Sequence, residues 1–225
     1  MKKAIAVSML ALLWVSTLWA AQPGEWKKVK ESDGIIGWTR STPLSPVDEC
    51  RAQGIIDAPV AVIEAIVRDT TTMKRYMFMC SDAFEIKDAS LKTSKDFYYM
   101  YFRQGMPWPV SDRYGVGSMD WMLDKTPGGV LARGINQTIS FTPPVRKAVQ
   151  MPVVRASWRM EPAGENKTKM TYMCLAAPGG NLPTSAVNFM IKNIGVSTIK
   201  ELRNLAKEEP YRSAKTIVTT TAYHE

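Results

Sequence analysis

The chain has 225 residues, of which 45% are hydrophobic and 22% charged, close to the average of globular proteins. This composition argues against disorder, collagen and coiled coil, and the length suits one domain or two small ones. The single histidine, His224, lies beside the C-terminus, which argues against histidine-dependent catalysis and histidine-rich metal sites. The net charge of +8 includes no long run of Lys or Arg. Nucleic acid is therefore a poor candidate partner, whereas an anionic membrane surface or a plain solvated surface fits.

Residues 1–21 predict a secretory signal peptide. Two lysines form a positive start, residues 4–19 are mostly apolar, and Ala20 and Ala21 offer a cleavage site before a Pro-Gly break. The apolar stretch is short for a spanning helix, which needs about 20 residues; an uncleaved N-terminal anchor stays open as the alternative. Because the compact basic start is typical of bacteria, we expect a secreted protein located in the periplasm.

The mature chain begins with short elements. Residues 25–32 are polar with Trp26 and Val29 three apart, which predicts a short amphipathic helix. Residues 35–41 and 48–57 predict strands, the second because apolar and polar side chains alternate along it. Asp57, closely followed by a proline, predicts the N-cap of a helix over residues 60–69.

Strands fill the middle of the chain, and one helix follows them. The predicted strands are residues 77–87, 94–103, 111–123, 130–141, 153–161 and 167–175. Residues 184–209 carry apolar side chains near helical spacing without a proline, which predicts one long C-terminal helix. Residues 210–225 predict a loose, flexible tail. A long helix after consecutive antiparallel strands indicates an α+β fold, in which sheet and helix can enclose a ligand cavity.

Residues 101–114 (YFRQGMPWPVSDRY) resemble START domains, the lipid-transfer family related to steroidogenic acute regulatory protein. Residues 51–59 (RAQGIIDAP), 158–162 (WRMEP) and 178–183 (PGGNLP) match in the same order, so the resemblance covers most of residues 25–209. It implies a helix-grip fold, in which a curved antiparallel sheet wraps around a long C-terminal helix. It also implies a deep apolar tunnel that holds one lipid or sterol-like ligand without a covalent bond, in a protein expected to be a monomer.

The resemblance further implies a lid formed by the C-terminal helix and the loop of residues 104–110. This loop places Met106 and Trp108 where they can touch a bilayer transiently, because aromatic side chains favour the membrane interface. Packing of Trp108 on the terminal helix is the alternative.

The match to the family pattern is incomplete. Arg113 occupies the arginine of the motif, but Tyr114 replaces the aspartate that usually follows. Met119 stands where several lipid-binding relatives place an arginine that points into the cavity. Arg133 in the next predicted strand is the candidate substitute, with a surface arginine as the alternative.

Twelve methionines follow residue 21, and flexible, polarizable methionine both lines promiscuous apolar sites and fills cores. Alternation with Lys167 and Lys169 predicts that Met170, Tyr172 and Cys174 face inward. The expected ligand-binding residues are Met100, Met106, Trp108, Arg113, Met119, Arg133, Met170, Tyr172, Val187, Met190 and Ile191.

Two other functions stay open. The helix-grip superfamily includes cyclases and hydrolases, for which Glu64, Asp96, Asp112 and Asp120 are the candidate bases. No phosphate loop or nucleophile elbow is present, so we expect neither an enzyme nor a cofactor or metal. A protein-binding adaptor with a vestigial cavity, using the long helix as its interface, is the third function.

The cysteines are too far apart for a CxxC motif. In the helix-grip plan, strands 48–57 and 167–175 pair antiparallel. The residue numbers of antiparallel partners add up to a constant. A pairing of Cys50 with Cys174 therefore also places Ile56 opposite Thr168. An oxidising compartment would allow a Cys50–Cys174 disulfide and leave Cys80 free; buried unpaired thiols are the alternative.

Overall fold

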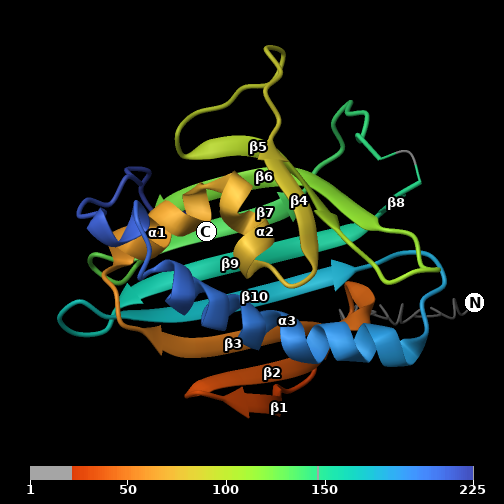
Figure 1. The fold of residues 1–225 in the computed structure, drawn as a ribbon, viewed down its shortest axis with the longest axis horizontal. Coiled ribbons are helices and arrows are strands. Elements are labelled where there is room, and N and C mark those ends of the chain that lie inside the picture. Colours follow the sequence, from red (N-terminus) through yellow and green to blue (C-terminus); the bar gives the residue numbers. More distant parts are fainter. Residues whose placement is uncertain (1–21, 146, 225) are drawn as a thin grey trace, which may run out of the picture.

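The computed structural model describes residues 22–145 and 147–224, so the predicted signal peptide lies outside the described residues. One large curved sheet dominates the fold, and the helices lie on the same face of it (Figure 1). The strands follow the order β1-β2-β3-β10-β9-β7-β6-β5-β4, with β8 beside β6. Their bounds are β1 Lys27–Ser32, β2 Ile35–Thr42, β3 Ser45–Ile56, β4 Cys80–Glu85, β5 Phe97–Gln104, β6 Arg113–Leu123, β7 Val130–Asn136, β8 Val149–Gln150, β9 Val153–Pro162 and β10 Thr168–Ala177.

The helices are α1 (Val60–Arg68), the single turn α2 (Met73–Tyr76) and the long α3 (Thr184–Leu205). Consecutive antiparallel strands followed by α3 confirm the predicted α+β helix-grip fold. The core lies between the sheet and the helices, since the inward residues of β10 and the second half of α3 are buried together. None of the helices in the described ranges is long and apolar enough to cross a bilayer.

The predicted helix over residues 25–32 is wrong. This segment forms the edge strand β1, which pairs with β2 through a tight hairpin that places Ser32 opposite Ile35. The two turn residues, Asp33 and Gly34, both have positive φ values of 54° and 69°. Such a turn matches the twist of paired strands, so hairpin pairing prevails over the helical spacing of two apolar residues.

Helix α1 begins differently from the expectation. Its N-cap residue is Pro59, and no side chain caps the helix. Asp57 lies two residues before that cap and pairs instead with Lys167, at 3.5 Å between Oδ1 and Nζ. The apolar face of α1 is buried, so packing on the sheet stabilises this short helix without a capping bond.

The C-terminal segment is packed rather than loose. After Pro210 the chain forms a 3-10 turn, Tyr211–Ser213. It then returns along α1, where the backbone N–H of Thr219 donates to Glu64 at 2.8 Å and that of Thr220 to Asp96 at 3.1 Å. Figure 1 places this segment beside α1, at the end of the molecule opposite the start of α3. The partners of the tail come from distant parts of the sequence, and periodicity within the tail does not indicate them.

Candidate functional site

A small apolar cavity lies between the sheet and its covering helices. Its wall includes Met100 of β5 and Met119 of β6, as predicted, together with Met73 and Met77 at the two ends of α2. The remaining wall residues are Phe102, Gln104, Val116, Gly117, Ser118, Gly134, Ile135, Asn136, Val154, Ala156, Trp158, Cys174, Ala176 and Ile194. Within the described part of the chain, this wall contains no Asp, Glu, Lys, Arg or His.

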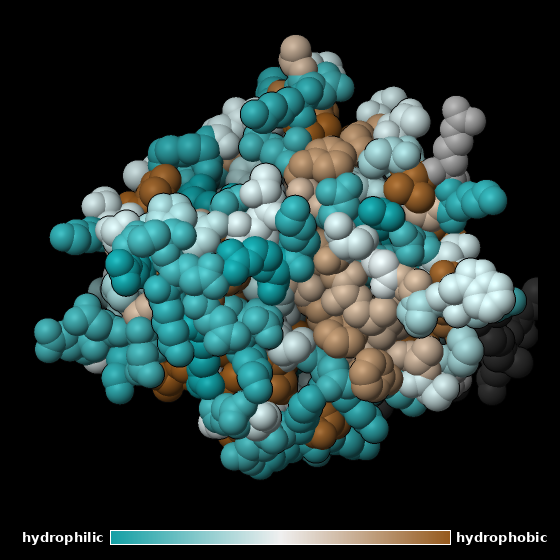
Figure 2. Space-filling model, viewed as in Figure 1, coloured by the Kyte–Doolittle hydropathy of each residue, from teal (hydrophilic) through white to brown (hydrophobic). Residues whose placement is uncertain are grey.

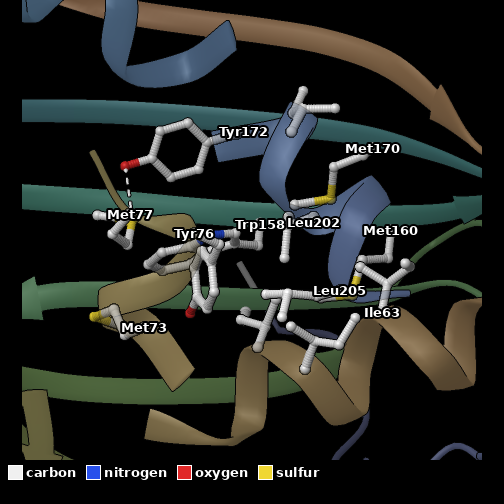
Figure 3. Close-up of a cluster of buried hydrophobic side chains, with 14 of the residues drawn as sticks. Ile63, Met73, Tyr76, Met77, Trp158, Met160, Met170, Tyr172, Leu202 and Leu205 are labelled. Atoms are coloured by element: carbon white, nitrogen blue, oxygen red, sulfur yellow. Dashed lines mark hydrogen bonds between the residues drawn. The ribbon is translucent and has the colours of Figure 1, made fainter. Parts of the chain in front are cut away.

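The cavity is small because large side chains fill the interior. Its volume is about 40 Å³, whereas pockets for drug-sized ligands measure about 300–1,000 Å³. Figure 3 shows Tyr76, Met77, Trp158, Tyr172 and Met170 crowded into the space between the sheet and α3. The deep tunnel expected from the sequence is therefore absent in this conformation. A lipid-sized ligand requires these side chains, or the helix above them, to move.

Two further spaces lie next to the cavity, beside α3. The first, of about 30 Å³, shares Gln104, Cys174 and Ile194 with the cavity wall and is also lined by Met190. The second is a surface groove of about 430 Å³, which shares Val187 and Ile191 with the first. The predicted residues Val187, Met190 and Ile191 therefore line these neighbouring spaces beneath the first half of α3, and not the cavity itself.

The two halves of α3 are held very differently. Residues 185–193 include no buried side chain, and Phe189 is 59% exposed. The second half buries Ile194, Ile199 and Leu202 completely or nearly so. Figure 2 shows apolar side chains gathered on the right half of the visible face, the side on which α3 begins. The first half of α3 is therefore held by little buried apolar contact with the rest of the fold.

A close contact marks the border between these halves. A Cβ added to Gly195 would lie 2.7 Å from the Cβ of Ala52 on β3, closer than real Cβ atoms approach. A Cβ added to Gly37 on β2 would lie 3.0 Å from Cγ2 of Val196, and one added to Gly54 on β3 would lie 3.4 Å from Cγ2 of Ile199. Small residues on both elements thus let α3 sit directly on the sheet at this point. The contact holds the second half of α3 directly against β3.

The loop between β5 and β6 exposes the predicted membrane residue. Trp108 is 92% exposed, so it does not pack on α3. Met106 is half-buried, and its backbone N–H donates to Asp112 Oδ1 at 3.0 Å. Asp112 also accepts from Arg103 at 2.8 Å. These bonds hold the base of the loop in place while the indole of Trp108 faces solvent.

Arg113 holds the turn that leads into α3. Its side chain is buried and donates to the carbonyl oxygens of Pro178 at 3.1 Å and Gly179 at 3.2 Å, and also to that of Ser111. Gly179 and Gly180 have φ values of 63° and 64°, a region that favours glycine. Arg113 is not part of the cavity wall. Arg113 therefore positions the turn that precedes α3 and does not line the cavity.

Three other predicted residues lie away from the cavity wall. Met170 and Tyr172 face inward as predicted and are fully buried, but they belong to the core behind the wall. The Tyr172 hydroxyl donates to Met77 Sδ at 3.7 Å. Arg133 pairs with Asp120 at 2.9 Å and borders a shallow pocket on the other face of the sheet. Arg133 is therefore not a polar anchor inside the cavity, because its position on β7 alternates with the inward Ala132 and Gly134.

The cysteine pair has the predicted register. Cys50 lies opposite Cys174 and Ile56 opposite Thr168 in the pairing of β3 with β10. All three cysteines are nevertheless free thiols, so the predicted disulfide is absent from this structure. The Cys50 thiol donates a hydrogen bond to Cys174, which, together with burial, raises the pKa of Cys50. Directly opposed Cβ atoms lie about 4.5–5.5 Å apart, wider than the 3.5–4.5 Å typical of a disulfide.

The candidate bases are engaged in structural bonds. Glu64 is fully buried and accepts from Arg68 at 3.0 Å as well as from the C-terminal segment. Asp96 accepts from the same arginine at 2.8 Å. Asp112 and Asp120 are paired with arginines as described above. None of the four carboxylates lies in the cavity wall, so none is placed to act on a ligand there.

Asp96 should make stability sensitive to acid. Burial opposes its ionisation, but hydrogen bonds from Lys95, Thr220, Thr221 and Arg68 outweigh it and hold the pKa of Asp96 well below its usual range. A depressed pKa contributes stability above the unfolded pKa of about 3.9 that is lost as the pH falls through the folded value. We expect the free energy of unfolding to decrease below about pH 5. In Asp96→Asn this decrease should be shallower, as urea unfolding between pH 7 and 3 would measure; equal slopes would contradict the assignment.

Apart from Met100 and Met119, the residues of the wall were not predicted as site residues; Gln104 and Trp158 are two of these. Gln104 ends β5 and is buried, and it lines both the cavity and the adjoining space. Trp158 lies in the middle of β9 and is also buried. Alternation along residues 153–161 places Trp158 on the same face as Val154 and Met160, so the sequence does contain the signal for its inward orientation. It does not indicate which inward residues meet the cavity.

Comparisons with known proteins agree with this architecture. No protein-family profile matches the chain. An uncharacterized protein of Pseudomonas aeruginosa is 25% identical over 208 residues, which cover 92% of this chain and 100% of that protein. A STAR-related lipid transfer protein from Xanthomonas axonopodis superposes with a TM-score of 0.70 and 23% identity, covering 81% of this chain and 99% of that one. Human StAR-related lipid transfer protein 5 gives a TM-score of 0.71 with 15% identity, covering 81% and 86% of the two chains. The chain therefore has the helix-grip fold of STAR-related lipid transfer domains.

Proposed function

We propose that this protein binds a lipid or sterol-like ligand inside the helix-grip fold and carries it between membranes or to a partner. The observation that carries the proposal is an uncharged, methionine-rich cavity beneath a helix half without buried side chains. Solved STAR-related lipid transfer proteins with the same fold support it. With the signal peptide predicted for residues 1–21, the protein would act as a periplasmic carrier.

Ligand uptake proceeds through movement of the first half of α3. This half moves about the contact between Gly195 and Ala52. The movement joins the cavity, the adjoining space and the surface groove into one opening. The methionines of the wall adopt other rotamers to enlarge the interior, since methionine is unbranched and adaptable. Removing apolar ligand surface from water contributes about 25 cal/mol per Å², so several hundred Å² supply on the order of 10 kcal/mol before binding costs.

The exposed indole of Trp108 provides the contact with the membrane. The β5–β6 loop that carries Trp108 lies at the same end of the fold as the beginning of α3 (Figure 1), so insertion of this loop at the interface brings the first half of α3 close to lipid. Trp side chains are favoured at the membrane–water interface because the ring is apolar and the N–H is polar.

Trp108→Ala should slow the transfer of a fluorescent sterol between vesicles about fivefold, corresponding to about 1 kcal/mol of lost interfacial affinity. The free energy of unfolding should change by less than about 0.5 kcal/mol, because the side chain is 92% exposed. Stopped-flow transfer assays and urea unfolding measure the two quantities.

Leu123→Ala is the matched control. Leu123 is also an exposed apolar residue, but it ends β6 at the opposite end of that strand from Arg113 and the β5–β6 loop. Its replacement should leave transfer unchanged. If Trp108→Ala transfers lipid as fast as the wild type, Trp108 has no role in the gate.

Native mass spectrometry of the purified protein separates the three candidate functions. A bound lipid of one mass class supports the carrier. Conversion of a bound ester would instead support a hydrolase, although the engaged state of Glu64, Asp96, Asp112 and Asp120 supports a protein without catalysis. The absence of both a lipid and lipid transfer would contradict the proposal and favour the protein-binding adaptor.

A further inference from the structure

The cavity wall contains one buried hydrogen-bond donor without a partner. Trp158 is 2% exposed and lines the cavity, with its ring 5.4 Å from that of Tyr172. Its Nε1 is buried and has no hydrogen-bond partner among the residues that the structure describes. Another buried tryptophan of the fold, Trp121, donates its Nε1 to the Tyr98 hydroxyl at 3.3 Å. An unpaired buried N–H costs about 1–3 kcal/mol, so a ligand atom that accepts from it gains an advantage.

The other polar groups of the wall restrict which acceptor fits. Asn136 already uses both ends of its amide, donating to the Pro152 carbonyl and accepting from the Val154 N–H. Gln104 donates only a long bond of 3.4 Å to the Phe78 carbonyl. Because the wall holds no cation, a carboxylate or phosphate would lose its hydration without a counter-charge. A neutral oxygen can instead accept the Trp158 hydrogen bond at little desolvation cost.

We infer that Trp158 is a specificity-determining residue that donates a hydrogen bond to a neutral acceptor oxygen, such as a ketone, an ester carbonyl or a hydroxyl, on an otherwise apolar ligand. This inference rests on the proposed lipid-binding function and narrows its ligand class. The Met77 and Tyr172 side chains around Trp158 (Figure 3) provide apolar surface for the hydrocarbon part beside the acceptor.

A matched pair of probes tests the inference: 2-undecanone, and undecane delivered from a cyclodextrin complex. Their affinities are measured by displacement of the fluorescent apolar probe N-phenyl-1-naphthylamine. The wild type should bind the ketone about tenfold more tightly than the hydrocarbon, after correction for their different solubilities. Trp158→Phe should abolish this preference, and the smaller ring should affect the two probes alike. The difference between the probes therefore isolates the hydrogen bond.

Tyr101→Phe is the matched control variant. The Tyr101 hydroxyl is also buried without a partner in the described chain, but Tyr101 packs with Phe84 and Phe141 in a separate apolar cluster and is not part of the cavity wall. This variant should keep the tenfold preference for the ketone. Undecanoate should bind more weakly than 2-undecanone at neutral pH, since its charge finds no counter-charge in the wall.

A measurement on the wild type keeps the test independent of variant folding. The carbonyl carbon of 13C-labelled 2-undecanone should resonate downfield in the bound state relative to the ketone in hexane, because hydrogen bonding deshields it. A hexane-like shift, or equal affinity for both probes in the wild type, overturns the role of Trp158 while lipid binding stands. If neither probe displaces the fluorophore and no lipid is bound or transferred, the proposed function fails as well.

Discussion

Glu64→Gln is expected to lower the free energy of unfolding by about 3 kcal/mol, because it breaks a buried ion pair from one side. The two carboxylate oxygens accept four hydrogen bonds: from Arg68, from the N–H groups of Val218 and Thr219, and from the Thr219 hydroxyl. A glutamine replaces one oxygen by an NH₂ group, which faces donors and cannot accept. The substitution also removes one of the two ion pairs of the nearly buried Arg68, so that its charge is paired with Asp96 alone.

The same substitution should release the C-terminal segment. Residues 218–221 are held mainly by Glu64 and Asp96, so limited proteolysis should cleave Glu64→Gln in this segment faster than the wild type. Glu208→Gln is the control, since its ion pair with Arg75 is about half exposed and worth about 0–1 kcal/mol. Equal unfolding free energies for the two variants in urea would show that the buried network does not hold the tail.

The general architecture could be predicted because it depends on local patterns. Alternation identified β3 and the inward face of β10, and helical spacing of apolar residues without a proline identified α3. The pairing of Cys50 with Cys174 followed from the helix-grip plan that the START resemblance implies, together with the inward face of each strand. Strand β1 was missed because two apolar residues in a short polar segment fit a helix and an edge strand equally well.

The site was predicted less completely because it depends on contacts between distant elements. Met100 and Met119 lie in the wall, but the sequence could not show that Arg113 binds the turn before α3 or that Arg133 faces the other side of the sheet. The volume of the cavity depends on how Tyr76, Trp158 and the methionines share one space, which no single strand determines. The binding of the tail to Glu64 joins residues 154 positions apart.

Gly195→Ala is expected to destabilise the protein although alanine is the better helix former. In an unconstrained helix this change would stabilise by up to about 1 kcal/mol. Here the new methyl group would lie 2.7 Å from the Cβ of Ala52, and both atoms are attached directly to backbone. Such overpacking typically costs about 1–3 kcal/mol, so we expect a net loss on the order of 1 kcal/mol in urea unfolding.

Ala52→Gly provides the rescue that separates this contact from a general effect on α3. Alone it should destabilise, because glycine in a strand interior is unfavourable by about 0.5–1 kcal/mol. Combined with Gly195→Ala, it moves the methyl group from the sheet to the helix and removes the clash. The double variant should therefore be more stable than the sum of the single changes predicts, by about 1 kcal/mol or more. Lipid transfer should be slower in Gly195→Ala than in the double variant. In the single variant the clash displaces the second half of α3, about which the first half moves. Additive free energies would mean that α3 does not rest on β3 at Gly195, and that the lid moves about another position.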